Sequence, residues 1–122
     1  MKNKVIDYVA MNEATKILGL AKSSSSQLSR WIKDGKIQGT FSFGRSVAIP
    51  VSWLRSECLE RGISWDGIEL EDGETGVSLK DYLDINEWAE LNNLTYSKVY
   101  NDIVNGRRHD YIKFGVSYGL PK

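Results

Sequence analysis

Residues 43–50 read Phe-Gly-Arg-Ser-Val-Ala-Ile-Pro, and residues 114–121 return to the same pattern as Phe-Gly-Val-Ser-Tyr-Gly-Leu-Pro. The two stretches lie 71 residues apart, and nearer the N-terminus the offset becomes 74, which pairs Tyr8 with Tyr82. Shared turn, core and proline positions over about 40 residues indicate a duplicated structural unit. Further pairs at these offsets are Leu20 and Leu94, Ser26 and Ser97, Ile32 and Ile103, and Gly35 and Gly106. We therefore expect two related modules, each with a small core.

The composition of the 122 residues is that of an ordinary folded protein, with 41% hydrophobic residues. No apolar run approaches the roughly 18 residues of a membrane span, and the N-terminus lacks the apolar region of a signal peptide. We therefore expect a cytoplasmic protein that does not bind membranes. Cys58 is the only cysteine and His109 the only histidine. An intrachain disulfide and a thiol-based metal cluster are excluded, and we expect no metal and no cofactor.

The net charge of zero conceals a strong segregation of charge along the chain. Residues 1–55 carry a net charge of +6, residues 56–90 carry −9, and residues 91–122 carry +3. Two basic ends therefore flank an acidic middle. We interpret the acidic middle either as a solvated linker or as a surface for a partner.

Each module begins with two short helices that a tight turn joins. In the first module we expect helices over residues 12–18 and from Ser24 to Gly35, because apolar residues recur at helical spacing and glycines follow. In the second module Asp84 and Thr95 are the expected N-caps. This arrangement is that of a helix-turn-helix, whose second helix enters the DNA major groove. Helical hairpins that only pack a core share the same form.

A hairpin and a third helix complete the first module. Residues 37–43 and 46–49 are strand-like runs around a Gly-Arg turn, and Pro50 suits the start of a helix over 51–61. We therefore predict a mainly α fold with small β-hairpin wings, built as two tandem winged helix-turn-helix modules. The predicted bounds are 1–62 for the first module, 63–80 for an acidic linker or acidic hairpin, and 81–122 for the second module, which lacks its third helix.

Several motifs of the first module occur together in one family: Tyr8-Val9-Ala10-Met11-Asn12-Glu13-Ala14, Leu18-Gly19-Leu20, Trp31-Ile32-Lys33-Asp34-Gly35-Lys36-Ile37, Phe43-Gly44-Arg45, and Ile49-Pro50 before Trp53-Leu54. With these motifs, residues 7–62 resemble the small winged helix-turn-helix domains of phage and transposon excisionases, which are similar to the DNA-binding domain of MerR-type regulators. In that family the second helix enters the major groove, and the wing contacts the DNA backbone or minor groove. The resemblance implies DNA contacts by Ser25, Ser26, Gln27, Ser29, Arg30, Lys33 and Arg45.

The corresponding positions of the second module predict a weaker DNA-binding surface. Val116 stands where Arg45 does, and Asp102 adds a negative charge to the second helix. Candidate DNA-binding residues in this module are Tyr96, Ser97, Lys98, Asn101, Arg107 and Arg108. Without a third helix, a module of about 40 residues leaves apolar side chains uncovered. We expect the first module's third helix, a second copy of the chain in a homodimer, or another protein to cover them. Candidate partner-binding residues are Trp65, Trp88 and Tyr111.

No motif indicates catalysis, since the chain has no phosphate-binding glycine loop, no nucleophile elbow and no cluster of metal ligands. We predict a non-catalytic protein that binds double-stranded DNA, with single-stranded DNA as an alternative ligand. It would serve a bacterial mobile genetic element in excision, transcriptional control or replication. The alternative is a protein-interaction subunit, because the size and doubled layout also resemble small proteins that accompany a mobile-element primase-polymerase. Such a subunit would join the polymerase to nucleic acid.

Overall fold

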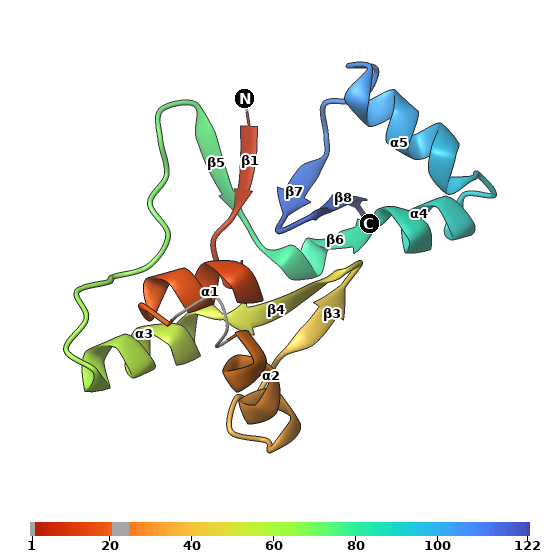
Figure 1. Ribbon diagram of the computed structural model, residues 1–122. Helices are drawn as coiled ribbons and strands as arrows, with labels where there is room; N and C mark the ends of the chain where they lie inside the picture. Colours follow the sequence, from red (N-terminus) through yellow and green to blue (C-terminus); the bar gives the residue numbers. More distant parts are fainter. Residues whose placement is uncertain (1, 21–24) are drawn as a thin grey trace.

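The computed structural model describes residues 2–20 and 25–122. Within these residues the chain forms five α-helices and eight strands in three sheets, with 37% of residues helical and 26% in strands. The fold is therefore a mix of α and β structure, and the predicted mainly α fold with small hairpin wings is wrong. The reason is that a strand before each pair of helices joins the following hairpin in a three-stranded sheet (Figure 1).

Among the described residues, every helix is too short or too polar to span a lipid bilayer.

The first unit of the fold spans residues 8–60 and places a small sheet against three helices. Its elements are β2 (Tyr8–Ala10), α1 (Met11–Ile17), α2 (Ser25–Lys33), β3 (Phe41–Phe43), β4 (Ser46–Pro50) and α3 (Val51–Glu60). The antiparallel sheet has the strand order β2-β4-β3. Val9 and Ile49 from neighbouring strands pack with Leu28 of α2 and Leu54 of α3, and all four side chains are buried. This cluster is the core of the first unit.

The second unit, residues 82–121, repeats this arrangement without a counterpart of α3. Its elements are β6 (Tyr82–Asp84), α4 (Ile85–Leu91), α5 (Tyr96–Val104), β7 (Ile112–Phe114) and β8 (Ser117–Pro121). The strand order β6-β8-β7 matches that of the first sheet. The register matches as well, because Tyr8 lies opposite Pro50 and Tyr82 lies opposite Pro121. The strand pairing within one sheet therefore corresponds to that within the other at the same offsets of 74 and 71 residues that relate the two halves of the sequence.

A third, two-stranded sheet joins the N-terminus to the acidic segment. The connecting elements are β1 (Lys2–Val5), β5 (Glu74–Val77) and η2 (Leu79–Asp81), a single 3-10 turn. β1 and β5 pair in parallel, whereas residues 63–72 contain no strand, so the hairpin alternative for this segment is not formed. Charge favours the observed pairing, because the Lys4 ammonium lies 3.8 Å from the Glu74 carboxylate. The acidic segment thus finds its strand partner in the basic N-terminus.

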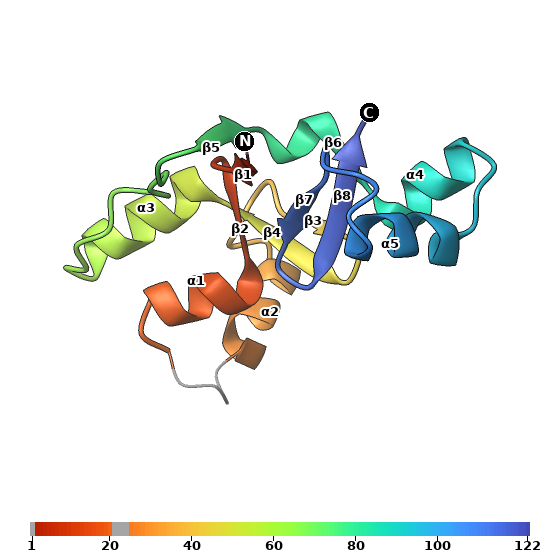
Figure 2. The ribbon, with the colours of Figure 1, turned by 90° about the horizontal axis from the view of Figure 1, so that it is seen from above.

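The two three-stranded sheets pack face to face through a shared apolar core. Side chains alternate between the two faces of a strand, so Tyr8 and Ala10 face this core while Val9 faces the helices. The rings of Phe43 and Phe114, which the repeat relates, meet edge to face with centroids 5.9 Å apart. Figure 2 shows both sheets between the helices α1 and α2 on one side and α4 and α5 on the other. The buried members of the shared core are Val5, Tyr8, Ala10, Phe43, Ala48, Leu79, Tyr82, Ile112 and Phe114.

The tips of the two hairpins also contact each other's unit in a reciprocal way. The backbone N–H of Arg45 donates to Ser117 Oγ at 2.9 Å, and the backbone N–H of Val116 donates to Ser46 Oγ at 3.1 Å. Gly44 has a φ of +60°, and a Cβ at this position would lie 2.5 Å from Ser117 Oγ. Glycine is therefore needed both for the backbone conformation and for the close approach. This reciprocity relates the two units as the subunits of a symmetric dimer are related.

The face of the second unit that was expected to need a covering surface is partly covered from within the chain. The first unit's sheet does not provide this cover, because it packs on the opposite face of the second sheet, through the shared core. On the face that carries α4 and α5, Val99 and Ile103 are buried, whereas Leu91 is 73% exposed.

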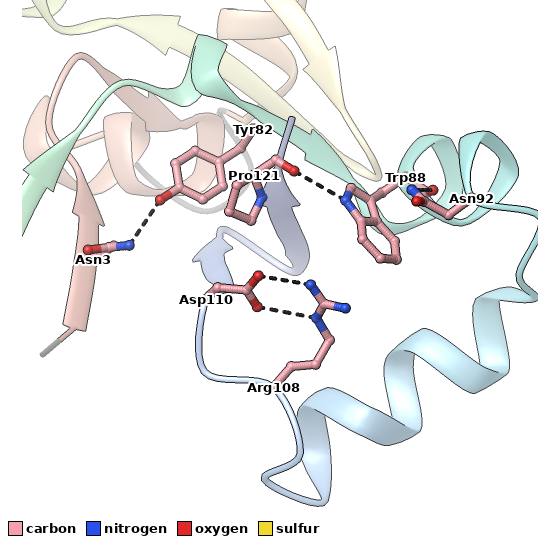
Figure 3. A network of polar contacts seen from close by, with 7 residues as sticks. All are labelled: Asn3, Tyr82, Trp88, Asn92, Arg108, Asp110 and Pro121. Carbon is pink, nitrogen blue, oxygen red and sulfur yellow. Dashed lines mark hydrogen bonds and ion pairs between the residues drawn. The ribbon is translucent and has the colours of Figure 1, made fainter.

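Trp88 covers part of this face of the second unit. Its repeat counterpart is the small, fully buried Ala14, whereas the Trp88 indole N–H reaches the Pro121 carbonyl at 3.1 Å (Figure 3). Pro121 corresponds to Pro50 in the first unit, and α3 begins directly after Pro50. The Trp88 indole therefore lies at the place in the second unit where the first unit continues into α3.

The shared core makes a testable prediction about cooperativity. Replacing Phe114 with Ala removes a buried ring from both units at once, so we expect it to lower the free energy of unfolding by about 3–5 kcal/mol. Urea unfolding followed by tryptophan fluorescence and by far-UV circular dichroism should give one coincident transition. Leu59→Ala on α3 is the control, because this side chain is 81% exposed and should change stability by less than about 0.5 kcal/mol. Two separate transitions, with only one of them moved by Phe114→Ala, would show that the units fold independently.

Candidate nucleic-acid interface

The outer side of α2 carries two cations and no acidic residue, and the turn that follows adds an exposed carboxylate, Asp34, and a third cation. Leu28 is buried in the core of the first unit, and this fixes which side of the helix faces solvent. Arg30 and Lys33 are exposed on the other side, and Lys36 is exposed in the turn that follows. Among the described residues none of these three cations forms an ion pair with a carboxylate. Their charges are therefore available to an anionic ligand.

The other residues predicted on α2 have different environments. Gln27 is half-buried at the start of the helix. Ser29 is also half-buried, and its hydroxyl donates to the Met11 sulfur at 3.6 Å, which ties α2 to α1. The side chains of Ser25 and Ser26 lie outside the described part of the chain. Of the predicted contact residues on α2, the structure thus brings Arg30 and Lys33 fully to the surface.

Arg45 does not lie beside the exposed face of α2. The turn between β3 and β4 points toward α4 and away from α2 (Figure 1). There the exposed Arg45 lines a hollow of about 310 Å³ together with Asn86, Tyr96 and Tyr118 of the second unit. The structure therefore separates two groups of residues that the family resemblance had assigned to one DNA contact.

The cations of the second unit are mostly neutralised by nearby carboxylates. On α5 the ammonium of Lys98 lies 3.2 Å from the Asp102 carboxylate, and the Arg107 guanidinium lies 3.4 Å from the same oxygen. Burial alone would raise the pKa of the Asp102 carboxyl, but the hydrogen bonds and charges of Lys98 and Arg107 outweigh this effect and lower the pKa. Ser97 and Asn101 are exposed on the same helix. The surface of α5 therefore carries less free positive charge than that of α2.

Arg108 is held in a structural contact. Its guanidinium makes two hydrogen bonds to the Asp110 carboxylate, at 3.2 and 2.8 Å (Figure 3). The same guanidinium lies 4.5 Å from the centre of the Trp88 ring, within the range of a cation–π contact. Figure 3 also shows the amide of Asn3 donating to the Tyr82 hydroxyl, which joins β1 to the second unit. Arg108 thus supports the fold, and its charge is offset by Asp110.

The three predicted partner-binding aromatics do not form one surface. Trp65 packs against the core of the first unit, whereas Trp88 and Tyr111 pack against the core of the second unit. All three are half-buried. Trp65 lines a hollow on the first unit together with Ile17, Ile68 and Glu69. Each aromatic therefore packs against the core of one unit.

Two further tyrosines adjoin one of the predicted residues on the surface. Tyr100 of α5 and Tyr118 of β8 lie next to the predicted Tyr96, with the Tyr100 and Tyr118 ring centroids 6.1 Å apart. For Tyr100 the signal in the sequence is its spacing of four residues from Tyr96, which places both on one side of a helix. Tyr118 comes from a strand, so its place beside them depends on how α5 packs on the sheet.

The lowered pKa of Asp102 is directly measurable. In a pH titration followed by NMR, the Asp102 carboxyl should titrate below the ordinary aspartate range, because its charged form is stabilised by two cations. The contribution of the carboxylate to stability is then present at neutral pH and is lost only as the pH falls through this lowered pKa. Lys98→Met should move the midpoint upward. An unchanged midpoint in that variant would show that the lysine does not hold the carboxylate, and Lys113→Met serves as the control.

Comparison with known proteins gives no assignment for this surface. No protein-family model, no curated protein and no solved structure matches the chain. The functional interpretation rests on the residues of the chain itself and on their arrangement.

Proposed function

We propose that the protein binds double-stranded DNA without catalysing a reaction, and that α2 is the element that contacts the duplex. The observation that carries this proposal is a nine-residue helix that has no acidic residue and whose exposed cations form no ion pair within the described part of the chain. The major groove of B-DNA admits one α-helix. Arg30 and Lys33 would then contact phosphates or base edges, while Leu28 anchors the helix to its unit.

Duplex DNA suits this helix because the phosphate backbone attracts cations irrespective of sequence, and because binding releases condensed counterions. The neutralised cations of α5 indicate that the second unit contributes less to this electrostatic attraction. The resemblance of residues 7–62 to excisionase domains supports a role as accessory factor of a bacterial mobile genetic element. An adjacent recombinase gene would favour excision, and an adjacent polymerase gene would favour replication.

A second candidate function is that of a protein-interaction subunit, which would join a mobile-element primase-polymerase to nucleic acid. It is supported by exposed aliphatic side chains at the turn between α4 and α5. Leu91 is 73% exposed there and Leu94 is 42% exposed. Both functions are compatible in one molecule, with α2 on the nucleic acid and the α4–α5 turn on the enzyme.

The proposed duplex contact is tested by fluorescence anisotropy with a labelled duplex and the full chain over a series of salt concentrations. If about four to six phosphates are contacted, the logarithm of the affinity should fall against the logarithm of the salt concentration with a slope of about −4 to −5. Lys33→Ala should weaken binding to all duplexes and reduce the steepness of this slope by about one. Arg30→Ala should do the same and, if it reaches a base edge, also change the sequence preference.

The matched control for these variants is Lys2→Ala on β1. Lys2 is exposed, has no ion pair among the described residues, and lies on the far side of the molecule from α2 (Figure 1). Its removal should leave both the affinity and the salt slope nearly unchanged. If Lys2→Ala weakens binding as much as Lys33→Ala, the attraction is a general effect of net charge and α2 has no special role.

A further inference from the structure

Four tyrosines form a continuous row on the surface of the second unit. The rings of Tyr96 and Tyr100 on α5 are nearly parallel, with an angle of 10° between them and centroids 5.9 Å apart. Tyr100 meets the ring of Tyr118 on β8 edge to face at 6.1 Å. Tyr118 in turn meets Tyr111 at 5.7 Å. Residues from a helix, a loop and a strand are thus brought into one aromatic row.

The outer end of the row is open to solvent. Tyr96 is 48% exposed and Tyr100 is 38% exposed, whereas Tyr111 and Tyr118 are half-buried and pack on the core of the second unit. The inner members therefore fix the outer ones in place. About half of Tyr96 and more than a third of Tyr100 therefore remain accessible to a ligand.

The repeat shows that the helix itself does not need these tyrosines. The position equivalent to Tyr100 in the first unit is Ser29, and the position equivalent to Tyr96 is Ser25. Both helices nevertheless have the same length and occupy the same place beside their sheets. A helix of this length therefore forms with serines at these two positions in the first unit.

Two cations lie beside the row, both of them near Tyr118, and the nearby carboxylates are already engaged. Arg45 lines the hollow that Tyr96 and Tyr118 border, and the Lys113 ammonium lies 5.6 Å from the centre of the Tyr118 ring. Neither cation forms an ion pair among the described residues. Asp84, in the same hollow, is buried and accepts the backbone N–H of Glu87. Asp102 on α5 is paired with Lys98 and Arg107.

We propose that this tyrosine row is a stacking platform for the unpaired bases of single-stranded nucleic acid, with Arg45 and Lys113 holding the backbone phosphates. The inference rests on the proposed function, because both require the chain to bind nucleic acid. Unpaired bases expose flat faces that stack on aromatic side chains, whereas the bases of a duplex already stack on one another. The row therefore favours single strands, and it lies on the unit whose α5 has the fewest free cations. A molecule with this layout would hold a junction between duplex and single strand.

The test compares two substitutions of one tyrosine in the full chain. Tyr100→Leu keeps an apolar side chain but removes the flat ring, and Tyr100→Phe keeps the ring. In anisotropy titrations with a labelled oligothymidine of about 15 nucleotides, we expect about a ten-fold loss of affinity for Tyr100→Leu and less than a two-fold change for Tyr100→Phe. Leu59→Ala, an 81% exposed side chain on α3 of the first unit, is the control and should bind as the unaltered chain does. An oligouridine of the same length shows whether RNA binds as well as DNA.

The outcomes separate this inference from the proposed function and from other occupants of the row. Weakened duplex binding in Lys33→Ala together with unchanged single-strand binding in Tyr100→Leu would support the proposed function and overturn the platform. No binding to either ligand would overturn both. If the leucine and phenylalanine variants bind the oligonucleotide equally well, base stacking is refuted. A chain that is dimeric by light scattering and becomes monomeric in Tyr100→Glu would instead make the row a contact between two copies. Circular dichroism of each variant checks that the fold is retained.

Discussion

The contact between the inner faces of the two sheets is the interaction on which the rest of the molecule depends. A three-stranded sheet with two or three short helices buries little apolar surface, and units of this size are marginal when alone. Here the ring of Phe43 packs on Phe114, and it lies so close to Gly119 that a Cβ there would be 2.6 Å from the ring. The two units thereby obtain one common core. The same contact fixes where each hairpin tip lies, and this determines which surface residues become neighbours.

Much of the local structure could be predicted from the sequence, because it depends on short-range patterns. The expected helices over 12–18 and 51–61 correspond within a residue or two to α1 and α3, and the Gly-Arg turn lies between paired strands. The fold class was wrong because Tyr8, Val9 and Ala10 are all buried, so this strand shows none of the alternation that marks a half-buried one. The parallel pairing of β1 with β5 joins segments about 70 residues apart, and no local pattern indicates such a partner.

The candidate nucleic-acid interface could be predicted only in part, because local sequence patterns do not show how distant segments pack. The exposed cations of α2 follow from helical periodicity, and the pairing of Lys98 with Asp102 follows from their spacing of four residues. The neighbours of Arg45 from the second unit could not be derived in this way, because they depend on the packing of one unit against the other. The family resemblance places a helix and a hairpin of the same module on one ligand. In this fold the second unit takes the place beside the hairpin, and the expected surface is divided between two regions.

The joining of two related units in one chain also removes a constraint that symmetric assemblies obey. In a homodimer every substitution occurs on both sides of the symmetry axis, so a surface cannot change on one side alone. Here Ser29 and Tyr100 occupy equivalent positions on α2 and α5, and so do Arg45 and Val116 at the hairpin tips. The scaffold is nearly symmetric while its surface has a direction. A linear polymer bound along such a molecule would be held in one orientation, with one of its ends distinguished from the other.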